Sequence, residues 1–383
     1  MAGKKRPFPW FTGMEHLPRG LAKAAEVAVG EVLRVKPEER VLLVTNPEPD
    51  VLAVSRALYD EAARAGARPL LLVQPRRTSL ENAHDGVIHA LRSEPEVILS
   101  ISADKLGKDP FGLVKPYRFP GTKGSWTHIF NALLGAGKSR SFWTPSITAE
   151  MFARTVPVDY RAMGDTARRL KRILDRASRI RITSPAGTDV EIGLEGRKTF
   201  LDTGALWKKG AGGNLPAGEV FISPANYDAR GIIVFDGSVS VADGGSAFLP
   251  RRPVRVHVEG GLVRRVEGGA GARRLERSLR LGEEAAHRMK GKKGWSRAKI
   301  ERYATNARHL GEVGIGLNPK ARITGNMLED EKVLGTCHVA IGTNYDEDAQ
   351  AFIHLDCLVR KPTILVRGSR GERPIMVEGK ILP

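Results

Sequence analysis

Helical and strand-like segments alternate along roughly the first 150 residues, and this alternation constrains the fold more than any other feature of the chain. Apolar residues recur at helical spacing over 20–35 and 51–65. Short apolar runs typical of strands occupy 40–45, 69–73 and, after a further helix, 97–101. Strands that alternate with helices favour a parallel sheet covered by helices. The first part of the chain is therefore predicted to be a parallel α/β layer.

The pattern changes after residue 179, where short apolar runs are separated by Gly and Pro. The predicted strands are 180–183, 189–192, 218–222, 232–235, 254–258 and 262–266. Two helices are expected among them, at 272–289 and 296–309. We therefore predict an α/β protein in two parts: an N-terminal parallel α/β domain over residues 1–160, and a β-rich α+β metal-binding catalytic domain over residues 161–383.

Composition indicates a globular protein with room for two ordinary cores, since 41% of its 383 residues are hydrophobic and 27% are charged. Only two cysteines occur, Cys337 and Cys357, which favours a reducing compartment over a disulfide framework. The start of the chain lacks the apolar core of a signal peptide, and no apolar run is long enough to span a membrane. A cytoplasmic protein without membrane contact is expected.

The net charge of +18 is the feature that points most strongly to another kind of partner. A strongly basic surface suits nucleic acid or another anionic surface. Basic residues gather in one broad region, 251–299, yet the sequence shows no RNA-binding signature and no stacked aromatic platform there. The sequence interpretation is a solvated basic surface, in preference to nonspecific nucleic-acid contact.

Five acidic and imidazole residues have the chemistry of metal ligands: Glu219, Glu312, His338, His354 and Asp356. His354 and Asp356 are two residues apart in a strand-like run, so their side chains project from the same face. His338 also interrupts an apolar run, where a buried imidazole costs several kcal/mol unless it is paired or coordinated. Three carboxylates and two histidines exceed the needs of one three-ligand centre, which suggests a two-metal site.

Four segments carry a resemblance to a known family: 214–221, 311–319, 330–342 and 354–356. In order and content they resemble the aminopeptidase T family of metallo-aminopeptidases. The resemblance implies that the five residues bind two divalent ions, drawn from Zn, Co, Mn or Mg, and that Tyr345 is an active-site tyrosine. It also implies peptide substrates with a free N-terminus and a homodimer.

The expected mechanism follows from that ligand set. Two cations would lower the pKa of a shared water and supply hydroxide to a peptide carbonyl. Glu312 is the predicted bridging carboxylate, and Tyr345 would donate a hydrogen bond to the oxyanion. By the same resemblance, the loop that contains His128 lies where two domains could close around a substrate, although a lone loop histidine is more often plain surface.

Two other functions are weighed against the aminopeptidase. His338, His354 and Asp356 alone form a 2-His-1-carboxylate set, as in mononuclear Fe(II) oxygenases, and ring-cleaving pyridinediol dioxygenases are similar to this peptidase fold. Glu219 and Glu312 favour the dinuclear hydrolase over that alternative. A basic binding protein without turnover would have a broken ligand set, whereas all five residues are present here.

Overall fold

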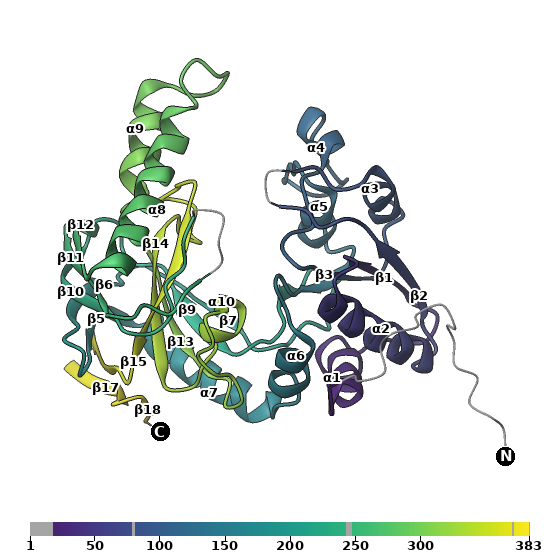
Figure 1. Ribbon diagram of the computed structural model, residues 1–383, viewed down its shortest axis with the longest axis horizontal. Helices are drawn as coiled ribbons and strands as arrows, with labels where there is room; N and C mark the ends of the chain where they lie inside the picture. Colours follow the sequence, from purple (N-terminus) through teal and green to yellow (C-terminus); the bar gives the residue numbers. More distant parts are fainter. Residues whose placement is uncertain (1–17, 79–80, 243–246, 370, 383) are drawn as a thin grey trace. The chain divides into compact units, whose positions relative to one another are not determined.

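The computed structural model describes residues 18–78, 81–242, 247–369 and 371–382, and divides into two compact units (Figure 1). The N-terminal unit comprises Met1–Val158 and Gly204–Ala217, and the C-terminal unit comprises Asp159–Thr203 and Gly218–Pro383. The sequence predicts one domain boundary, near residue 160. In the structure the chain also returns to the N-terminal unit over residues 204–217. No helix in the described part of the chain is both long and apolar enough to cross a membrane.

A parallel five-stranded sheet forms the centre of the N-terminal unit, with strand order β2-β1-β3-β4-β8. Its strands are β1 (Arg40–Thr45), β2 (Arg68–Val73), β3 (Val97–Ile101), β4 (Arg140–Trp143) and β8 (Gly212–Asn214). The helical segments are α1 (Leu21–Val27), the π-helix η1 (Ala28–Val32), α2 (Pro49–Arg64), α3 (Asp85–Leu91), α4 (Pro110–Val114), α5 (Ile129–Gly135) and α6 (Ala149–Thr155). The parallel α/β architecture predicted from the alternation is confirmed, and the returning segment supplies its edge strand β8.

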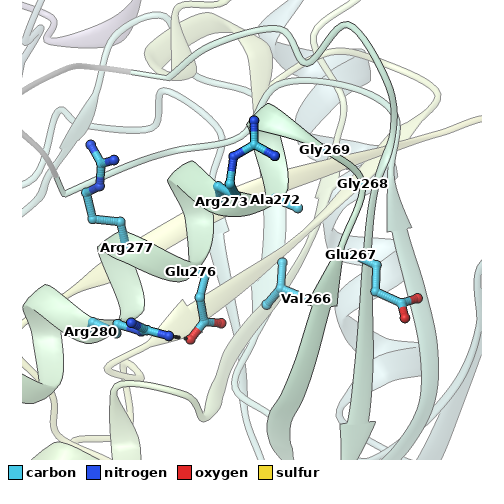
Figure 2. A pocket seen from close by; sticks show the side chains of 9 residues that line it. All are labelled: Val266, Glu267, Gly268, Gly269, Ala272, Arg273, Glu276, Arg277 and Arg280. Carbon is cyan, nitrogen blue, oxygen red and sulfur yellow. Dashed lines mark hydrogen bonds and ion pairs between the residues drawn. The ribbon is translucent and has the colours of Figure 1, made fainter.

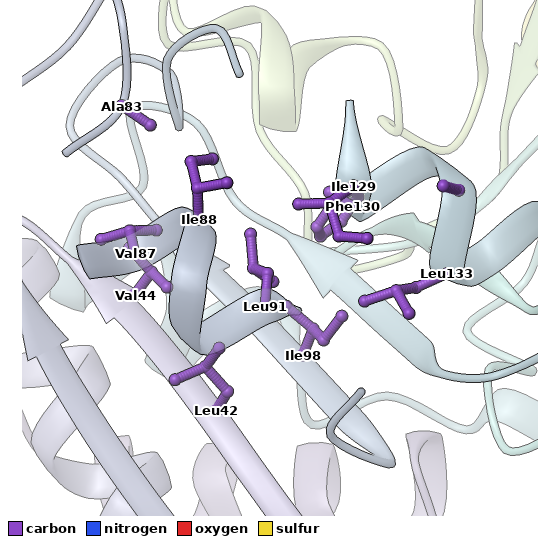
Figure 3. Packing of buried hydrophobic residues seen from close by; sticks show 11 residues of the cluster. Leu42, Val44, Ala83, Val87, Ile88, Leu91, Ile98, Ile129, Phe130 and Leu133 are labelled. Carbon is purple, nitrogen blue, oxygen red and sulfur yellow. The ribbon is translucent and has the colours of Figure 1, made fainter. Parts of the chain in front are cut away.

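Helices cover both faces of the central strands, which explains why their sequences are mostly apolar. Leu42 and Val44 of β1 and Ile98 of β3 pack against α3 and α5, where Leu91 and Leu133 are fully buried (Figure 3). The alternate residues of the same strands face the opposite side, which is covered by α2. A strand buried on both faces favours apolar side chains at most of its positions.

Two antiparallel sheets form the C-terminal unit. The larger, with order β12-β11-β10-β6-β5-β16-β17-β18, contains β5 (Ala177–Thr183), β6 (Asp189–Gly193), β10 (Ala229–Phe235), β11 (Val254–Glu259), β12 (Leu262–Glu267), β16 (Thr363–Gly368), β17 (Gly371–Val377) and β18 (Lys380–Ile381). The smaller, with order β15-β14-β13-β9-β7, contains β7 (Thr199–Asp202), β9 (Glu219–Ile222), β13 (Leu310–Gly316), β14 (Thr336–Gly342) and β15 (His354–Arg360).

Four helices accompany these sheets. They are α7 (Tyr160–Leu174), α8 (Ala270–His287), α9 (Arg297–Asn306) and the short α10 (Met327–Asp330). Helix α7 packs against β7 and β9 of the smaller sheet, and α8 packs along the edge strand β12 of the larger one. Helices α8 and α9 form a hairpin that extends beyond the sheets of this unit (Figure 1).

Candidate metal centre

Every strand of the smaller sheet contributes an acidic or imidazole side chain to one cluster, which is buried except at the half-buried His354 and Asp356. These residues are Asp202 on β7, Glu219 on β9, Glu312 on β13, His338 on β14, and His354 and Asp356 on β15. Strand register brings them together: Asp202 pairs with Glu219, while Glu312 and Asp356 both pair with Ala340 from opposite sides. All five ligands predicted from the sequence therefore meet, although they are spread over 138 positions from Glu219 to Asp356.

Glu312 occupies the middle of the cluster. Among the described residues, two groups of three place their ligand atoms within 4.8 Å of one another: Glu219, Glu312 and His338, and Glu312, His354 and Asp356. Glu312 belongs to both. The 2-His-1-carboxylate set considered from the sequence is not gathered into one group, because His338 lies in one and the other two residues lie in the other.

The two oxygens of Glu312 face different histidines. Oε1 lies 2.9 Å from His338 Nε2, and Oε2 lies 3.4 Å from His354 Nε2. His354 Nε2 is also 3.2 Å from Asp356 Oδ1, and His338 Nε2 is 3.5 Å from Glu219 Oε2. Glu312 therefore offers one oxygen to each of the two ligand groups.

Hydrogen bonding prepares the imidazole of His354 for a metal. Its Nδ1 lies 2.9 Å from the carbonyl oxygen of Thr343 and donates to it, so Nε2 is the ring nitrogen that faces the carboxylates. Glu219 Oε2 is buried and has no hydrogen-bond partner in the described structure. A directed imidazole nitrogen beside an unsatisfied carboxylate oxygen fits the donor set of a divalent cation.

Gly314 makes room for His338. The two residues are register partners on β13 and β14, and a Cβ at Gly314 would lie 2.1 Å from the Nε2 and Cε1 atoms of the His338 ring. Any side chain at this position would push the ring out of its place. The glycine thus allows the imidazole to lie across the neighbouring strand and reach Glu312.

Lys332 is a member of the cluster that sequence reasoning missed. Its side chain is fully buried, and its Nζ lies 2.5 Å from Glu219, 2.9 Å from Glu331 and 3.1 Å from Asp202. It follows α10 in a run of acidic residues that has the composition of a solvated loop. Only its position between a carboxylate on β7 and one on β9 reveals its role, because the sequence carries no signal for that burial.

The electrostatic state of the cluster reflects an excess of carboxylates. Burial lowers the pKa of His338, but the facing carboxylate of Glu312 outweighs this and raises it to about 9. Burial also lowers the pKa of His354, but the carboxylate of Asp356 outweighs this effect. The pKa of His354 therefore stands well above its usual range. Burial also raises the pKa of Glu219 to about 8, against the opposing effect of Lys332. The negative field that holds protons on the imidazoles is the same field that attracts a metal cation.

Three aromatic rings form a wall beside His354. Phe200 stacks on Phe221 with ring centroids 5.3 Å apart, and Tyr345 lies 4.8 Å from Phe221 and 5.4 Å from the His354 ring. Phe200 is 36% exposed and Tyr345 is 51% exposed, so the wall is open to solvent. Desolvation of the phenol, together with the carboxylates of Glu312 and Asp356, raises the pKa of Tyr345, which keeps its hydroxyl protonated.

His128 belongs to the N-terminal unit and caps a helix there. Its Nδ1 accepts a hydrogen bond from the N–H of Phe130 at the start of α5, and its Nε2 donates to the carbonyl of Gly107 at 3.0 Å. Burial lowers the pKa of His128 and keeps the ring neutral. Both ring nitrogens are therefore engaged in holding the local fold.

Both cysteines lie in the strands that carry the ligands. Cys337 precedes His338 on β14 and Cys357 follows Asp356 on β15, and each is a buried free thiol. Burial raises the pKa of both thiols far above the usual range. They are protonated side chains of the sheet, and neither belongs to the two ligand groups.

Comparison with known proteins places this site in a family. Residues 146–381 match the NicX family, described as 2,5-dihydroxypyridine 5,6-dioxygenase. The chain belongs to this family. Every residue of the cluster lies within the matched segment, which covers well over half of the chain. Among curated proteins, none matches.

Two solved structures share the fold of this NicX family member. One is the 2,5-dihydroxypyridine dioxygenase from Pseudomonas putida KT2440, with a TM-score of 0.68 and 16% identity, covering 94% of this chain and 96% of that one. The other is wild-type AmpT from Thermus thermophilus, with a TM-score of 0.64 and 20% identity, covering 96% of this chain and 100% of that one. At such identities the likeness establishes the fold alone.

The expectation of an aminopeptidase is wrong, because the family match is to a ring-cleaving dioxygenase. A cluster of carboxylates and imidazoles binds cations that serve either hydrolysis or oxygen chemistry, so ligand types alone do not separate the two. The resemblance to aminopeptidase T reflected a shared fold. The broader predictions, an enzyme with a metal site in its β-rich half, agree with the family and the cluster.

Proposed function

We propose that this protein is a metal-dependent dioxygenase that opens a hydroxylated pyridine ring of the 2,5-dihydroxypyridine class. The observation that carries the proposal is the family match over 146–381, which contains the whole carboxylate–histidine cluster. In the reaction, both atoms of dioxygen are added across a carbon–carbon bond of the ring. The ring is oxidised, dioxygen is reduced, and no further reductant is needed.

The residues that would hold the metal are Glu219, Glu312, His338, His354 and Asp356. Iron fits the reaction better than the Zn or Mg considered from the sequence, since neither of those ions exchanges electrons. When bound, iron supplies the one-electron chemistry with dioxygen that side chains cannot provide. Thr343 keeps the His354 ring in the tautomer that presents Nε2, and Lys332 holds Glu219 in place.

Charge balance supports two divalent ions. The cluster contains the carboxylates of Glu219, Glu312 and Asp356, to which Glu331 and Asp202 are added through Lys332. A bound metal would displace the protons that His338, His354 and Glu219 otherwise hold, and five carboxylates and one ammonium would then leave four negative charges. Two divalent cations would neutralise them, one in each of the two groups that share Glu312. An unbalanced charge is energetically costly in a buried site, which favours two bound ions over one.

The aromatic wall is suited to a planar ring as substrate. Aromatic rings attract one another in offset-stacked or edge-to-face arrangements, at about 0.5 to 1.5 kcal/mol for each pair. Phe200 and Tyr345 offer exposed ring surface next to His354, and the Tyr345 hydroxyl can donate a hydrogen bond to a substrate oxygen. A ring held on this wall would lie beside the imidazole of a proposed ligand.

The test is oxygen uptake by the purified protein after anaerobic loading with Fe(II). 2,5-Dihydroxypyridine is supplied as substrate, loss of its ring absorbance is followed, and the product is analysed by mass spectrometry with isotopically labelled dioxygen. Incorporation of both labelled atoms is the expected result. Elemental analysis of the same sample gives the metal count, with about two ions expected for each chain.

Zinc-loaded protein is the matched control, since it fills the same ligands without redox chemistry. An iron-loaded protein that consumes no dioxygen with this substrate, or with catechol and hydroquinone in parallel, would contradict the proposed reaction. Activity with the carbocyclic compounds alone would retain ring opening but reject the pyridine. One bound iron with full activity would reject the two-ion arrangement only.

A further inference from the structure

The α8–α9 hairpin and the two strands before it carry much of the positive charge of the protein. Residues 251–302 contain 16 Lys and Arg against 6 Asp and Glu, a local net charge of +10 in a chain of +18. More than half of the excess charge thus lies in about a seventh of the sequence. The proposed reaction uses none of these residues, so the concentration calls for a separate physical explanation.

Helix α8 arranges part of this charge in a line. Arg273, Arg277, Arg280 and Arg288 follow one another at helical spacings of four, three and eight residues, which places them on one side of the helix. The opposite side packs on the larger sheet through Leu275, Leu279 and other buried residues. The arginine row extends over about 22 Å at the helical rise.

A groove of about 430 Å³ lies along the first part of this row, between α8 and the end of β12. Its lining includes Arg273, Arg277 and Arg280, and Figure 2 shows Arg273 and Arg277 projecting from the same side of the helix. The carboxylates of the lining are already paired: Glu276 binds Arg308 at 2.6 Å, and Glu267 binds His257 at 3.0 Å.

Arg273 and Arg277 have no side-chain partner within the described parts of the chain. The other arginines nearby differ from them. Arg280 pairs with Glu276 at 3.4 Å and Arg265 pairs with Glu267 at 3.2 Å. Two adjacent guanidinium groups line the groove, each with five unused N–H donors. Such a surface can donate hydrogen bonds to an anionic ligand such as a phosphate.

The same hairpin carries an aromatic cluster that the sequence did not reveal, because one ring comes from a distant segment. Trp295 stacks on Phe352 with centroids 5.5 Å apart and planes 24° apart, and Tyr303 contacts both. The Lys299 ammonium lies 4.4 Å from the Trp295 ring centroid. Phe352 is 43% exposed, which leaves ring surface available.

We propose that the α8–α9 hairpin binds single-stranded nucleic acid, with the phosphate backbone along the arginine row and bases on the aromatic cluster. A positive track combined with exposed aromatic rings is the arrangement by which proteins hold single strands without reading sequence. The row is longer than a small anion needs. An anionic membrane fits less well, because the apolar side of α8 is buried in the protein and is not free to insert.

The test is fluorescence anisotropy of the full chain with a labelled single-stranded oligonucleotide over a range of salt concentrations. The variant is Arg273→Ala with Arg277→Ala. Its control is Arg68→Ala with Arg118→Ala, two exposed arginines of the N-terminal unit whose side chains have no partner in the described structure, which removes the same charge elsewhere. The hairpin variant is expected to bind about tenfold more weakly, with a salt slope smaller by about 1.4.

An oligonucleotide that lacks bases provides the second measurement, and weaker binding than the complete strand is expected if the rings stack on bases. Equal losses in the two double variants would overturn the proposal, because they would show an effect of total charge. Binding to anionic lipid vesicles that is tighter than to the oligonucleotide, and that the hairpin variant loses, would assign the surface to membranes instead. Circular dichroism of both variants excludes unfolding as the cause.

Discussion

The central strands of the two units are buried to the same degree but contain different chemistry. In the N-terminal unit β3 is buried at all five positions, and apart from Ser100 its side chains are apolar. In the C-terminal unit β13 and β14 are buried at all seven positions, yet they carry Glu312 and His338. The central strand β3 of the first sheet carries no charged residue, whereas β13 and β14 of the second carry charged residues that face shared partners. Buried strand positions can therefore hold carboxylates and imidazoles where these groups face one another or a shared ammonium.

The difference has an energetic consequence. The parallel sheet is stabilised by apolar contacts, each nearly independent of the next. The charged sheet depends on one network, in which Glu312 meets two histidines and Lys332 meets three carboxylates. We expect changes in the first sheet to affect stability, and changes in the second to affect metal binding and catalysis as well.

Glu312→Gln is the substitution with the largest expected effect. The amide keeps the shape of the carboxylate but removes the charge that both groups share, so turnover should fall by more than about 100-fold and metal content should drop. Oxygen uptake and elemental analysis measure the two effects. Glu191→Gln, at a half-buried position of the larger sheet where Glu191 pairs with Arg230, should change neither. Full activity in Glu312→Gln would remove this residue from the site.

Lys332→Met tests the network through stability. The methionine fills similar space but leaves Asp202, Glu219 and Glu331 without their shared cation, a loss of about 3 to 5 kcal/mol for a broken buried ion pair. Denaturant unfolding of the metal-free protein measures it. The exposed pair of Lys138 with Glu94 is the comparison, and Lys138→Met should cost less than about 1 kcal/mol.

Leu91→Ala is the matching change in the apolar sheet. Leu91 is fully buried between α3 and the sheet, and its truncation should cost about 3 to 4 kcal/mol (Figure 3). Hydrogen exchange of the β3 amides reports this loss within the N-terminal unit. Leu70→Ala, at a position 53% exposed on the edge strand β2, should cost less than about 0.5 kcal/mol. Equal protection in the two variants would reject the packing described for α3.

His309 makes the stability of the C-terminal unit depend on pH. Burial, and then Arg197, lowers the pKa of His309 to about 4, while Asp348 acts in the opposite direction. The unfolded chain binds a proton at a higher pH than the folded chain does, so stability falls as pH drops. The expected loss is about 2 kcal/mol between pH 7 and pH 5. A His309→Gln variant with an equally steep acid dependence would contradict this cause.

Phe200→Leu should have the smallest effect. Removing one ring from the wall beside His354 leaves the ligands in place, so KM for the ring substrate should rise about three- to tenfold while kcat changes less. Steady-state kinetics of ring opening separates the two constants. Phe248→Leu, in the same unit but outside the wall, is the control. A fall in kcat with unchanged KM would mean that the wall does not bind the ring.

Periodicity predicted much of this fold. The strands at 40–45 and 97–101 have the predicted bounds. The helix predicted over 272–289 is observed at Ala270–His287, two residues earlier at each end. The returning strand β8 was not predictable, because Gly212–Asn214 has no strand-like pattern and pairs only through its neighbour β4. Local sequence determines local elements, whereas strand order depends on contacts between distant segments.

The candidate site shows the same limit. The chemistry of the five acidic and imidazole residues was visible in the sequence, and they meet as expected. Lys332 was not visible, since its burial depends on carboxylates more than 100 residues away. The reaction itself was misjudged because the same ligand types serve hydrolysis and oxygenation. The family match, rather than any residue of the site, separates the two.

The two buried thiols bear on how long such a catalyst lasts. Oxidants attack thiolates that solvent can reach, and the rate falls when the sulfur stays protonated and enclosed. Cys337 and Cys357 adjoin His338 and Asp356 in sequence, yet burial holds both in the unreactive form. If oxygen is activated at this centre, as proposed, the thiols closest to it in sequence are shielded from partly reduced oxygen species, and inactivation by cysteine oxidation should be slow.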